Sequence, residues 1–137
     1  MTGFDIDCTG DVVVGDRIQF TESVWQKRRH PRKIGERTIR AVVIRDSYGA
    51  LKQTHTFSLK IISCNGVMPY AQGKVITRRG YQIYRRGTLR SAWSNEPARE
   101  EALAEKHKRG EKARQARRRR AMIFESLEKV ATLLLSI

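Results

Sequence analysis

The sequence predicts an α+β protein in which a small antiparallel β-barrel precedes a long basic helix. Three observations indicate this class. Residues 12–85 contain about five short apolar or alternating segments with glycines between them. Residues 94–137 are rich in strong helix formers. The 137 residues also carry 28 Lys and Arg against 14 Asp and Glu, and this net charge of +14 favours a polyanionic partner.

Two strand candidates lie in the first third of the chain. Val12–Phe20 starts as an apolar run, is interrupted by a glycine–aspartate turn signal, and then alternates. Residues 37–45 carry β-branched side chains on both faces, which is typical of a strand covered in part on both sides. Between these candidates we expect a loop over residues 27–33, because Pro31 cannot donate to a strand ladder.

The next segments predict one more strand and then a hairpin. Over residues 53–63, apolar side chains alternate strictly with polar ones, which gives a strand with one buried and one wet face. Lys74–Arg78 and Tyr81–Arg85 are predicted to pair around a tight turn. The two tyrosines of the second hairpin strand would point to opposite faces, so at most one of them can serve the core.

A helix is predicted for residues 94–137. Ser94 or Asn95 can cap its N-terminus, and Pro97 suits its first turn. Acidic residues in that turn also favour the helix dipole. Gly110 is a candidate break that would divide the helix in two.

The domain plan has three parts. We expect a flexible N-terminus over residues 1–10, the barrel over residues 11–93, and the helix over residues 94–137. Cys8 and Cys64 stand far apart and belong to no metal-ligand pattern, which favours a reducing, cytoplasmic setting. We expect no signal peptide, and no apolar run approaches the ~20 residues of a membrane span.

An apolar seam lies near the end of the predicted helix. It has the 4-3-4 spacing of a heptad pattern and consists of Ile123, Leu127, Val130 and Leu134. Large apolar side chains in a row need to be covered. Two interpretations are open, namely packing against the barrel of the same chain and contact with another molecule, either a second copy or a partner protein.

The clustered positive charge makes nucleic acid, either RNA or DNA, the leading partner, because phosphate contacts release counterions. A loop, a hairpin and a helix each carry a basic outcrop that is expected to bind backbone phosphates. The outcrops are Lys27, Arg28, Arg29, Arg32 and Lys33; Arg78, Arg79, Arg85 and Arg86; and Arg117, Arg118, Arg119 and Arg120. Trp25 and Tyr84 are the candidates for stacking on unpaired bases. A merely solvated surface is the alternative for each outcrop, and arginines can also dock on acidic proteins.

The sequence favours neither catalysis nor metal binding. It contains no Ser/His/Asp arrangement and no glycine-rich phosphate loop, and its carboxylates form no pair on a core strand. His55 lies on the apolar face of a strand, where a half-buried structural histidine is the simpler interpretation. We therefore expect a protein that is not an enzyme and that needs no metal or cofactor.

Several segments resemble the SH3-like small-barrel proteins of the translation and transcription apparatus. The similar stretches are Val14–Phe20, Gly35–Arg45, Thr54–Ser63 and Arg85–Arg90. The nearest likeness is to a bacterial large-subunit ribosomal protein of this fold and spans residues 12–90, while the basic loop and the tail depart from it. The resemblance implies an SH3-like barrel and a habit of binding RNA or DNA, but no individual site. In overall style the chain also resembles the small basic accessory proteins of bacteriophages.

Two functions follow as hypotheses. The first is a non-enzymatic nucleic-acid-binding protein that grips backbone phosphates largely without regard to sequence. The alternative is a phage or mobile-element regulator that binds a host nucleic-acid-processing complex, such as RNA polymerase, a ribosome or a nuclease. In that case the basic helix would enter an acidic channel and the apolar seam would fill a groove. Neither hypothesis involves a membrane.

Overall fold

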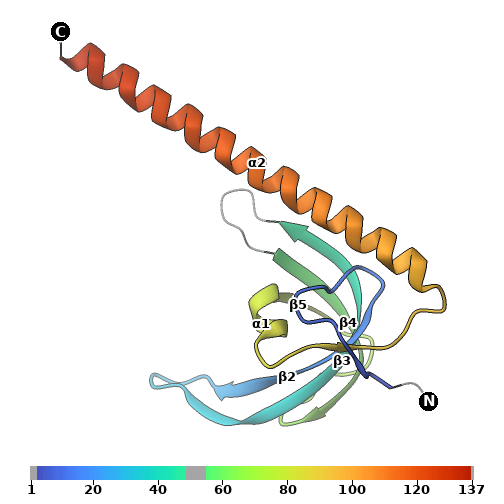
Figure 1. The fold of residues 1–137 in the computed structure, drawn as a ribbon. Coiled ribbons are helices and arrows are strands. Elements are labelled where there is room, and N and C mark those ends of the chain that lie inside the picture. Colours follow the sequence, from blue (N-terminus) through green and yellow to red (C-terminus); the bar gives the residue numbers. More distant parts are fainter. Residues whose placement is uncertain (1–2, 49–54, 137) are drawn as a thin grey trace.

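The computed structural model describes residues 3–48 and 55–136, which form one antiparallel sheet and two helices (Figure 1). The sheet has six strands in the order β1-β6-β2-β3-β4-β5. The elements are β1 (Ile6–Asp7), β2 (Arg17–Gln26), β3 (Arg32–Tyr48), β4 (His55–Gly66), β5 (Val75–Arg79), α1 (Gly80–Tyr84), β6 (Leu89–Arg90) and α2 (Glu96–Leu135).

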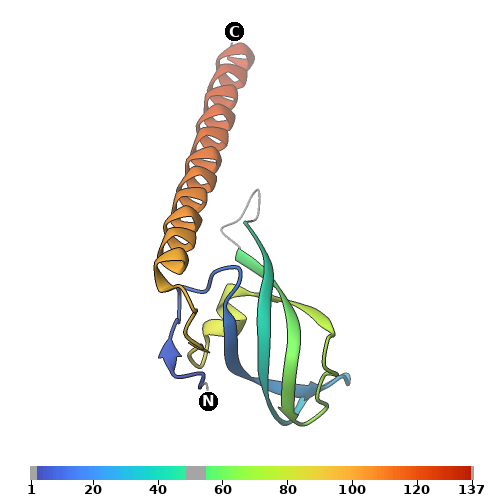
Figure 2. The same cartoon turned by 90° about the vertical axis from the view of Figure 1, so that its right-hand side faces the viewer.

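The α+β class is confirmed, whereas closure of the sheet into a barrel is not. The strands β2, β3 and β4 are long and form a strongly twisted sheet (Figure 2). The short strand β1 lies at one edge and β5 lies at the other. Within the described residues no strand pairing joins these two edges. The sheet is therefore open as far as its hydrogen-bonded ladder shows.

The core follows the alternation that predicted β4. Phe57, Leu59 and Ile61 of β4 are buried and belong to one cluster with Ile18 and Phe20 of β2. Full burial of one such side chain contributes roughly 1.5–3 kcal/mol of transfer free energy. The single buried face of the sheet thus supplies the cohesion of this small domain.

The predicted hairpin over residues 74–85 is wrong in its second half. The strand β5 ends at Arg79, and the chain then turns into the single-turn helix α1. The side chain of Gln82 accepts a hydrogen bond from the backbone N–H of Arg79 (2.8 Å), which favours the helical turn. The turn buries Ile83 in the core and leaves Tyr81 exposed, a combination that period-two spacing does not anticipate.

The segment expected to be a flexible N-terminus takes part in the fold. Ile6 and Asp7 pair with β6, and the backbone N–H of the buried Cys8 donates to the carbonyl oxygen of Thr88 (2.9 Å). The apolar run at Val12 and Val13 is buried too, but it lies outside the sheet, because β2 begins only at Arg17.

Helix α2 runs without a break from Glu96 to Leu135. The side chain of Asn95 accepts a hydrogen bond from the backbone N–H of Ala98 (3.2 Å), so the predicted N-cap is confirmed. Gly110 does not divide the helix and is buried against the body. The C-terminal half of α2 projects well beyond the sheet (Figures 1 and 2). Among the described helices, none has an apolar stretch long enough to cross a membrane.

A buried carboxylate holds α2 on the body. Asp16 is fully buried in the turn before β2, and Arg99 of α2 donates to it from Nε (2.9 Å) and Nη2 (3.0 Å). The indole Nε1 of Trp93 also donates to Asp16 (2.7 Å). About two turns further along α2, the buried Lys106 donates from Nζ to the carbonyl oxygen of Val12 (2.7 Å). These bonds fix the direction in which the helix leaves the domain.

Replacement of Asp16 by alanine should therefore lower the free energy of unfolding by about 3–5 kcal/mol, because it leaves the buried guanidinium of Arg99 without its carboxylate. Urea denaturation followed by circular dichroism measures this loss. The double variant Asp16→Ala/Arg99→Met should recover part of it, since neither charge is then buried.

Arg114→Ala is the matched control, because Arg114 lies on the same helix and pairs only at the exposed surface with Glu111. Its free energy of unfolding should stay close to that of the unmodified chain. An Asp16→Ala variant that is as stable as this control would show that the buried pair does not anchor α2.

Candidate nucleic-acid interface

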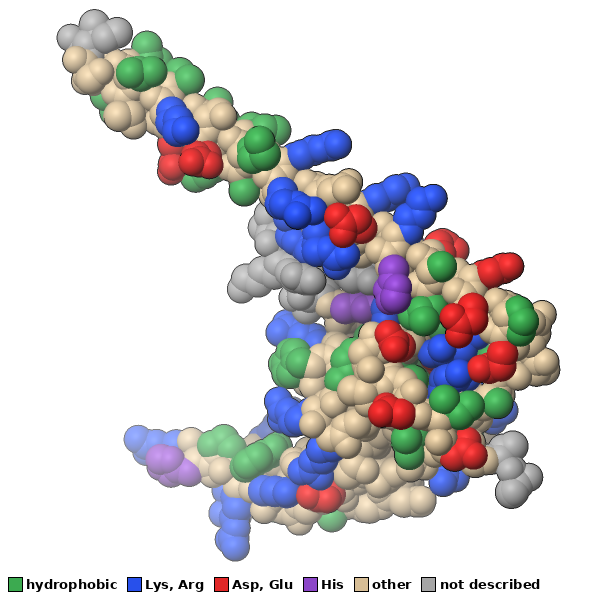
Figure 3. Space-filling view, viewed as in Figure 1, with side chains coloured by type: hydrophobic (Ala, Val, Ile, Leu, Met, Phe, Trp, Pro, Cys, Tyr) green, Lys and Arg blue, Asp and Glu red, His purple; other side chains and the backbone are tan. Residues whose placement is uncertain are grey.

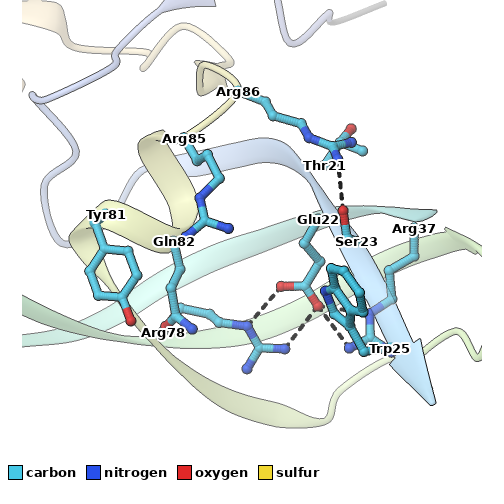
Figure 4. Close-up of a pocket in the computed structure, with 10 residues that line it drawn as sticks. All are labelled: Thr21, Glu22, Ser23, Trp25, Arg37, Arg78, Tyr81, Gln82, Arg85 and Arg86. Atoms are coloured by element: carbon cyan, nitrogen blue, oxygen red, sulfur yellow. Dashed lines mark hydrogen bonds and ion pairs between the residues drawn. The ribbon is translucent and has the colours of Figure 1, made fainter. Parts of the chain in front are cut away.

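A groove beside β2 and α1 brings together two aromatic side chains and four arginines (Figure 4). Its volume is about 350 Å³. Trp25 of β2 and Tyr81 of α1 flank it, and each exposes 56% of its surface. Large aromatic side chains with this exposure, in one groove, form a surface on which a planar ligand can stack.

The floor of the groove is a carboxylate held by two arginines. Glu22 of β2 accepts from Nε of Arg37 on β3 (2.8 Å) and from Nε and Nη2 of Arg78 on β5 (2.8 and 3.0 Å). The hydroxyl of Tyr70 accepts from Nη2 of each arginine (2.8 Å in both cases). Three strands are thereby joined at one point, and both oxygens of Glu22 are occupied.

Glu22 is ionised in this setting. Burial is the largest single effect on its pKa and opposes ionisation, but the hydrogen bonds and charges of Arg78 and Arg37 outweigh it, so the pKa lies below its ordinary value. The hydrogen bonds from Arg78 to Glu22 in turn raise the pKa of Arg78. The cluster therefore carries fixed charges, with one more positive than negative.

Two further arginines stand at the rim, directly after α1. Arg86 donates from Nη2 to the hydroxyl of Ser23 (2.7 Å) and pairs with Glu36 (2.7 Å). Arg85 is exposed, and its guanidinium carbon lies 5.8 Å from the centre of the Tyr81 ring. Among the described residues no carboxylate lies within ion-pair distance of Arg85. The lining as a whole holds four guanidinium groups and one carboxylate.

The predicted basic loop is the tip of the β2–β3 hairpin and continues from the groove. Trp25 pairs with Lys33, and Gln26 pairs with Arg32, so these two basic residues belong to β3 and not to the loop. The connection itself contains Lys27, Arg28 and Arg29, all exposed. Lys and Arg side chains gather at this tip and along the middle of α2 (Figure 3).

The structure thus unites part of the predicted site. Trp25, Arg78, Arg85 and Arg86 line the same groove, although they lie up to 61 positions apart in the chain. Arg79 is exposed but is not part of the lining.

Tyr84 does not fit the stacking role that was predicted for it. Its ring packs edge-on against Phe57 of the core (centroids 6.3 Å apart), and its hydroxyl accepts from the backbone N–H of Val12 (3.2 Å). Tyr81 takes the exposed place instead. The prediction that at most one of the two tyrosines serves the core is correct. The tyrosine chosen is wrong, because residues 80–84 form a helical turn and not a strand.

The groove also contains Arg37, which the sequence analysis did not single out. Arg37 lies on the polar side of β3, and its partner Glu22 is opposite it in the strand register. An arginine and a glutamate in opposite positions of paired strands are a usable signal once the register is known.

The arginine run of α2 lies outside the groove. Arg118, Arg119 and Arg120 are exposed, and Arg118 pairs with Glu111 (3.1 Å). The apolar seam beyond the run is uncovered: Ile123, Leu127, Val130 and Leu134 each expose 53–67% of their surface. Packing of the seam on the body of the same chain, which the sequence left open, is not what the structure shows (Figure 3).

Comparison with known proteins adds a family. A family model described as a domain of unknown function, DUF7699, matches residues 8–93. Zinc finger CCCH domain-containing protein 62 of Oryza sativa subsp. japonica is 33% identical over 123 residues, which is 85% of this chain and 18% of that protein. The chain thus spans less than a fifth of this curated relative. A match of 85% cannot end by residue 93, so it includes part of α2. No solved structure matches the chain.

This chain cannot itself supply the three cysteines that the letters CCCH denote, because it has only Cys8 and Cys64. Burial raises the pKa of the Cys8 thiol to about 12, so it stays protonated. Across residues 3–48 and 55–136, no three His, Cys, Asp or Glu side chains lie together in a way that could hold a metal ion.

Glu22→Gln should lower the free energy of unfolding at pH 7 by about 2 kcal/mol, because it replaces charge-assisted hydrogen bonds with neutral ones. Since the pKa of Glu22 is lower in the folded state, its stabilising effect is present above the ordinary value of 4.5 and is lost as the pH falls through the folded value. The difference in free energy of unfolding between Glu22→Gln and the unmodified chain should thus become smaller below pH 4.5. Urea titrations at several pH values can measure this difference.

Glu125→Gln, on the exposed outer part of α2, is the control for this measurement and should leave stability at pH 7 nearly unchanged. A gap between Glu22→Gln and the unmodified chain that stays constant from pH 7 to pH 3 would contradict the proposed role of the carboxylate.

Proposed function

We propose that this chain, which belongs to the DUF7699 family, is a non-enzymatic nucleic-acid-binding protein. One observation carries the proposal: two exposed aromatic side chains and four guanidinium groups line the same groove. Proteins that bind nucleic acid through backbone and base together combine a positive surface with aromatic platforms in this way.

The hairpin tip extends the positive surface of the groove. Lys27, Arg28 and Arg29 follow Trp25 by two to four positions, so a strand that reaches Trp25 passes these charges. None of the three has a carboxylate within ion-pair distance among the described residues. Each is therefore available to a phosphate, and each contact made would release condensed counterions.

The middle of α2 offers another basic surface to the same ligand. The helix has 40 residues and is therefore about 60 Å long. Arg118, Arg119 and Arg120 lie on its projecting part, where a long nucleic acid or an acidic protein surface can approach them. Their contacts would add affinity without sequence preference.

A protein partner is the second candidate, and the outer end of α2 is the observation that favours it. Eight large apolar side chains between Met122 and Leu135 expose 53–88% of their surface. An apolar surface of this kind on a soluble helix marks a contact with another chain. We propose two possible partners for this surface, namely the host nucleic-acid-processing complex of the alternative hypothesis and a second copy of this chain. An SH3-like relationship of the sheet is likewise a proposal.

The double variant Arg28→Ala/Arg29→Ala should weaken binding to a labelled oligonucleotide and lower the slope of log Kd against log salt by between about 1 and 2, because two phosphate contacts are lost. Fluorescence anisotropy at several salt concentrations measures both quantities. The matched control is Arg45→Ala/Lys60→Ala, which removes the same charge from exposed positions of β3 and β4 away from the hairpin tip.

An equal loss in the variant and in this control would show that net charge alone, and not the hairpin tip, governs binding. A complete lack of nucleic-acid binding at low salt would contradict the proposed function itself.

Leu127→Glu/Leu134→Glu should abolish any assembly that the outer end of α2 supports, because it places charges on the exposed seam. Light scattering coupled to gel filtration, on nuclease-treated protein, reports the assembly state. Binding of the double variant to an oligonucleotide should be retained, which would separate the second candidate function from the first.

A further inference from the structure

We infer that the groove receives an unpaired nucleobase between Trp25 and Tyr81, so that the ligand class is single-stranded nucleic acid and not duplex. The inference rests on the proposed function and deepens it. It depends on four features of the groove: its two aromatic walls, its size, the fixed charges of its floor and the exposed cation at its rim.

Two aromatic rings form the walls of the groove. Trp25 comes from a strand and Tyr81 from a helix, and the two flank the Glu22 cluster from either side (Figure 4). Both stay 56% exposed, although other aromatic rings of the sheet, such as Phe57, are buried. The fold therefore presents these two rings to the solvent across one groove.

The size of the groove and the accessibility of base faces both favour an unpaired base. A volume of about 350 Å³ lies in the range that accommodates a small organic group. In a duplex the faces of the bases are stacked on one another, and only their edges are reachable in the grooves. An aromatic side chain can contact the face of a base only where the strand is unpaired.

The floor of the groove is the cluster of Glu22, Arg37 and Arg78. Both oxygens of Glu22 are engaged by Arg37 and Arg78, so the carboxylate presents no uncompensated negative charge to an incoming phosphate. The guanidinium groups are held in place by the same bonds and by the hydroxyl of Tyr70. The polar floor is thus ordered before a ligand arrives and loses little side-chain freedom on binding.

Two arginines, Arg85 and Arg86, stand at the rim of the groove. Arg85 lies over the Tyr81 ring and, among the described residues, has no carboxylate within ion-pair distance, whereas Arg86 is paired with Glu36. Arg85 is therefore the rim cation best placed to bind the phosphate beside a base that stacks on Tyr81. Because every base has a π-face, this arrangement tolerates any base sequence.

The test compares ligands of equal charge with and without bases. Oligodeoxythymidylate of twelve nucleotides, an abasic strand of the same length and a duplex of the same length are titrated with the full chain at one salt concentration. The full chain should bind the thymidylate strand about tenfold more tightly than the abasic strand, since stacking supplies the difference. An oligouridylate of equal length, titrated in parallel, shows whether RNA or DNA is preferred.

Trp25→Ala should reduce the difference between the thymidylate and abasic strands to about threefold or less, and Trp25→Phe should keep most of it, because phenylalanine retains an aromatic face. Ile34→Ala is the matched control: Ile34 is an exposed apolar residue of the same hairpin that does not line the groove. It should leave the difference unchanged.

Equal affinity for the thymidylate and abasic strands, or tighter binding of the duplex, would overturn the inference while leaving nucleic-acid binding intact. A difference that survives Trp25→Ala would overturn it as well. If no strand binds at low salt, the proposed function fails together with the inference.

Discussion

The arrangement of this protein depends on Asp16, a carboxylate buried in the turn before β2. Its oxygens accept hydrogen bonds from Arg99, from the Trp93 indole and from the backbone N–H of Val13. A carboxyl group at this depth is tolerated only with such hydrogen-bond partners. Through it, the N-terminal segment, the sheet and α2 share one centre, and the position of the projecting helix follows from it.

Glu22 repeats the same device at the groove, and together the two carboxylates change the meaning of the net charge of +14. Arg99 is buried, Arg37 and Arg78 are half-buried, and all three hold the fold together through carboxylates. Exposed cations gather at the hairpin tip and in the middle of α2 (Figure 3), and others, such as Arg45 and Lys60, lie singly on the sheet. Arg99 is therefore not available to a polyanion, and Arg37 and Arg78 can be reached only at the floor of the groove.

The sequence predicted those features that arise within one element. Alternation over residues 55–63, the described part of the predicted strand, correctly predicted the buried face of β4, and Asn95 correctly marked the start of α2. Residues 53 and 54 of that prediction lie outside the described residues. The helical turn at residues 80–84 was not predicted, since a five-residue segment fits either period. Only the burial pattern, with Gly80 and Ile83 buried and Tyr81 exposed, distinguishes the two. The bond between Asp16 and Arg99 spans 83 positions, and no local pattern could reveal it.

We propose that nucleic acid binds at the groove while the buried anchor of α2 stays intact. The two tryptophans of the chain report on these places separately, since Trp25 lines the groove and Trp93 contacts Asp16 of the anchor. The most direct measurement is the shift of their indole N–H signals in a nitrogen–proton correlation spectrum during titration with oligodeoxythymidylate. We expect a saturable shift of the Trp25 signal and an unchanged signal from Trp93, whose indole N–H donates to Asp16. A strand that binds while the Trp25 signal stays in place would contradict it.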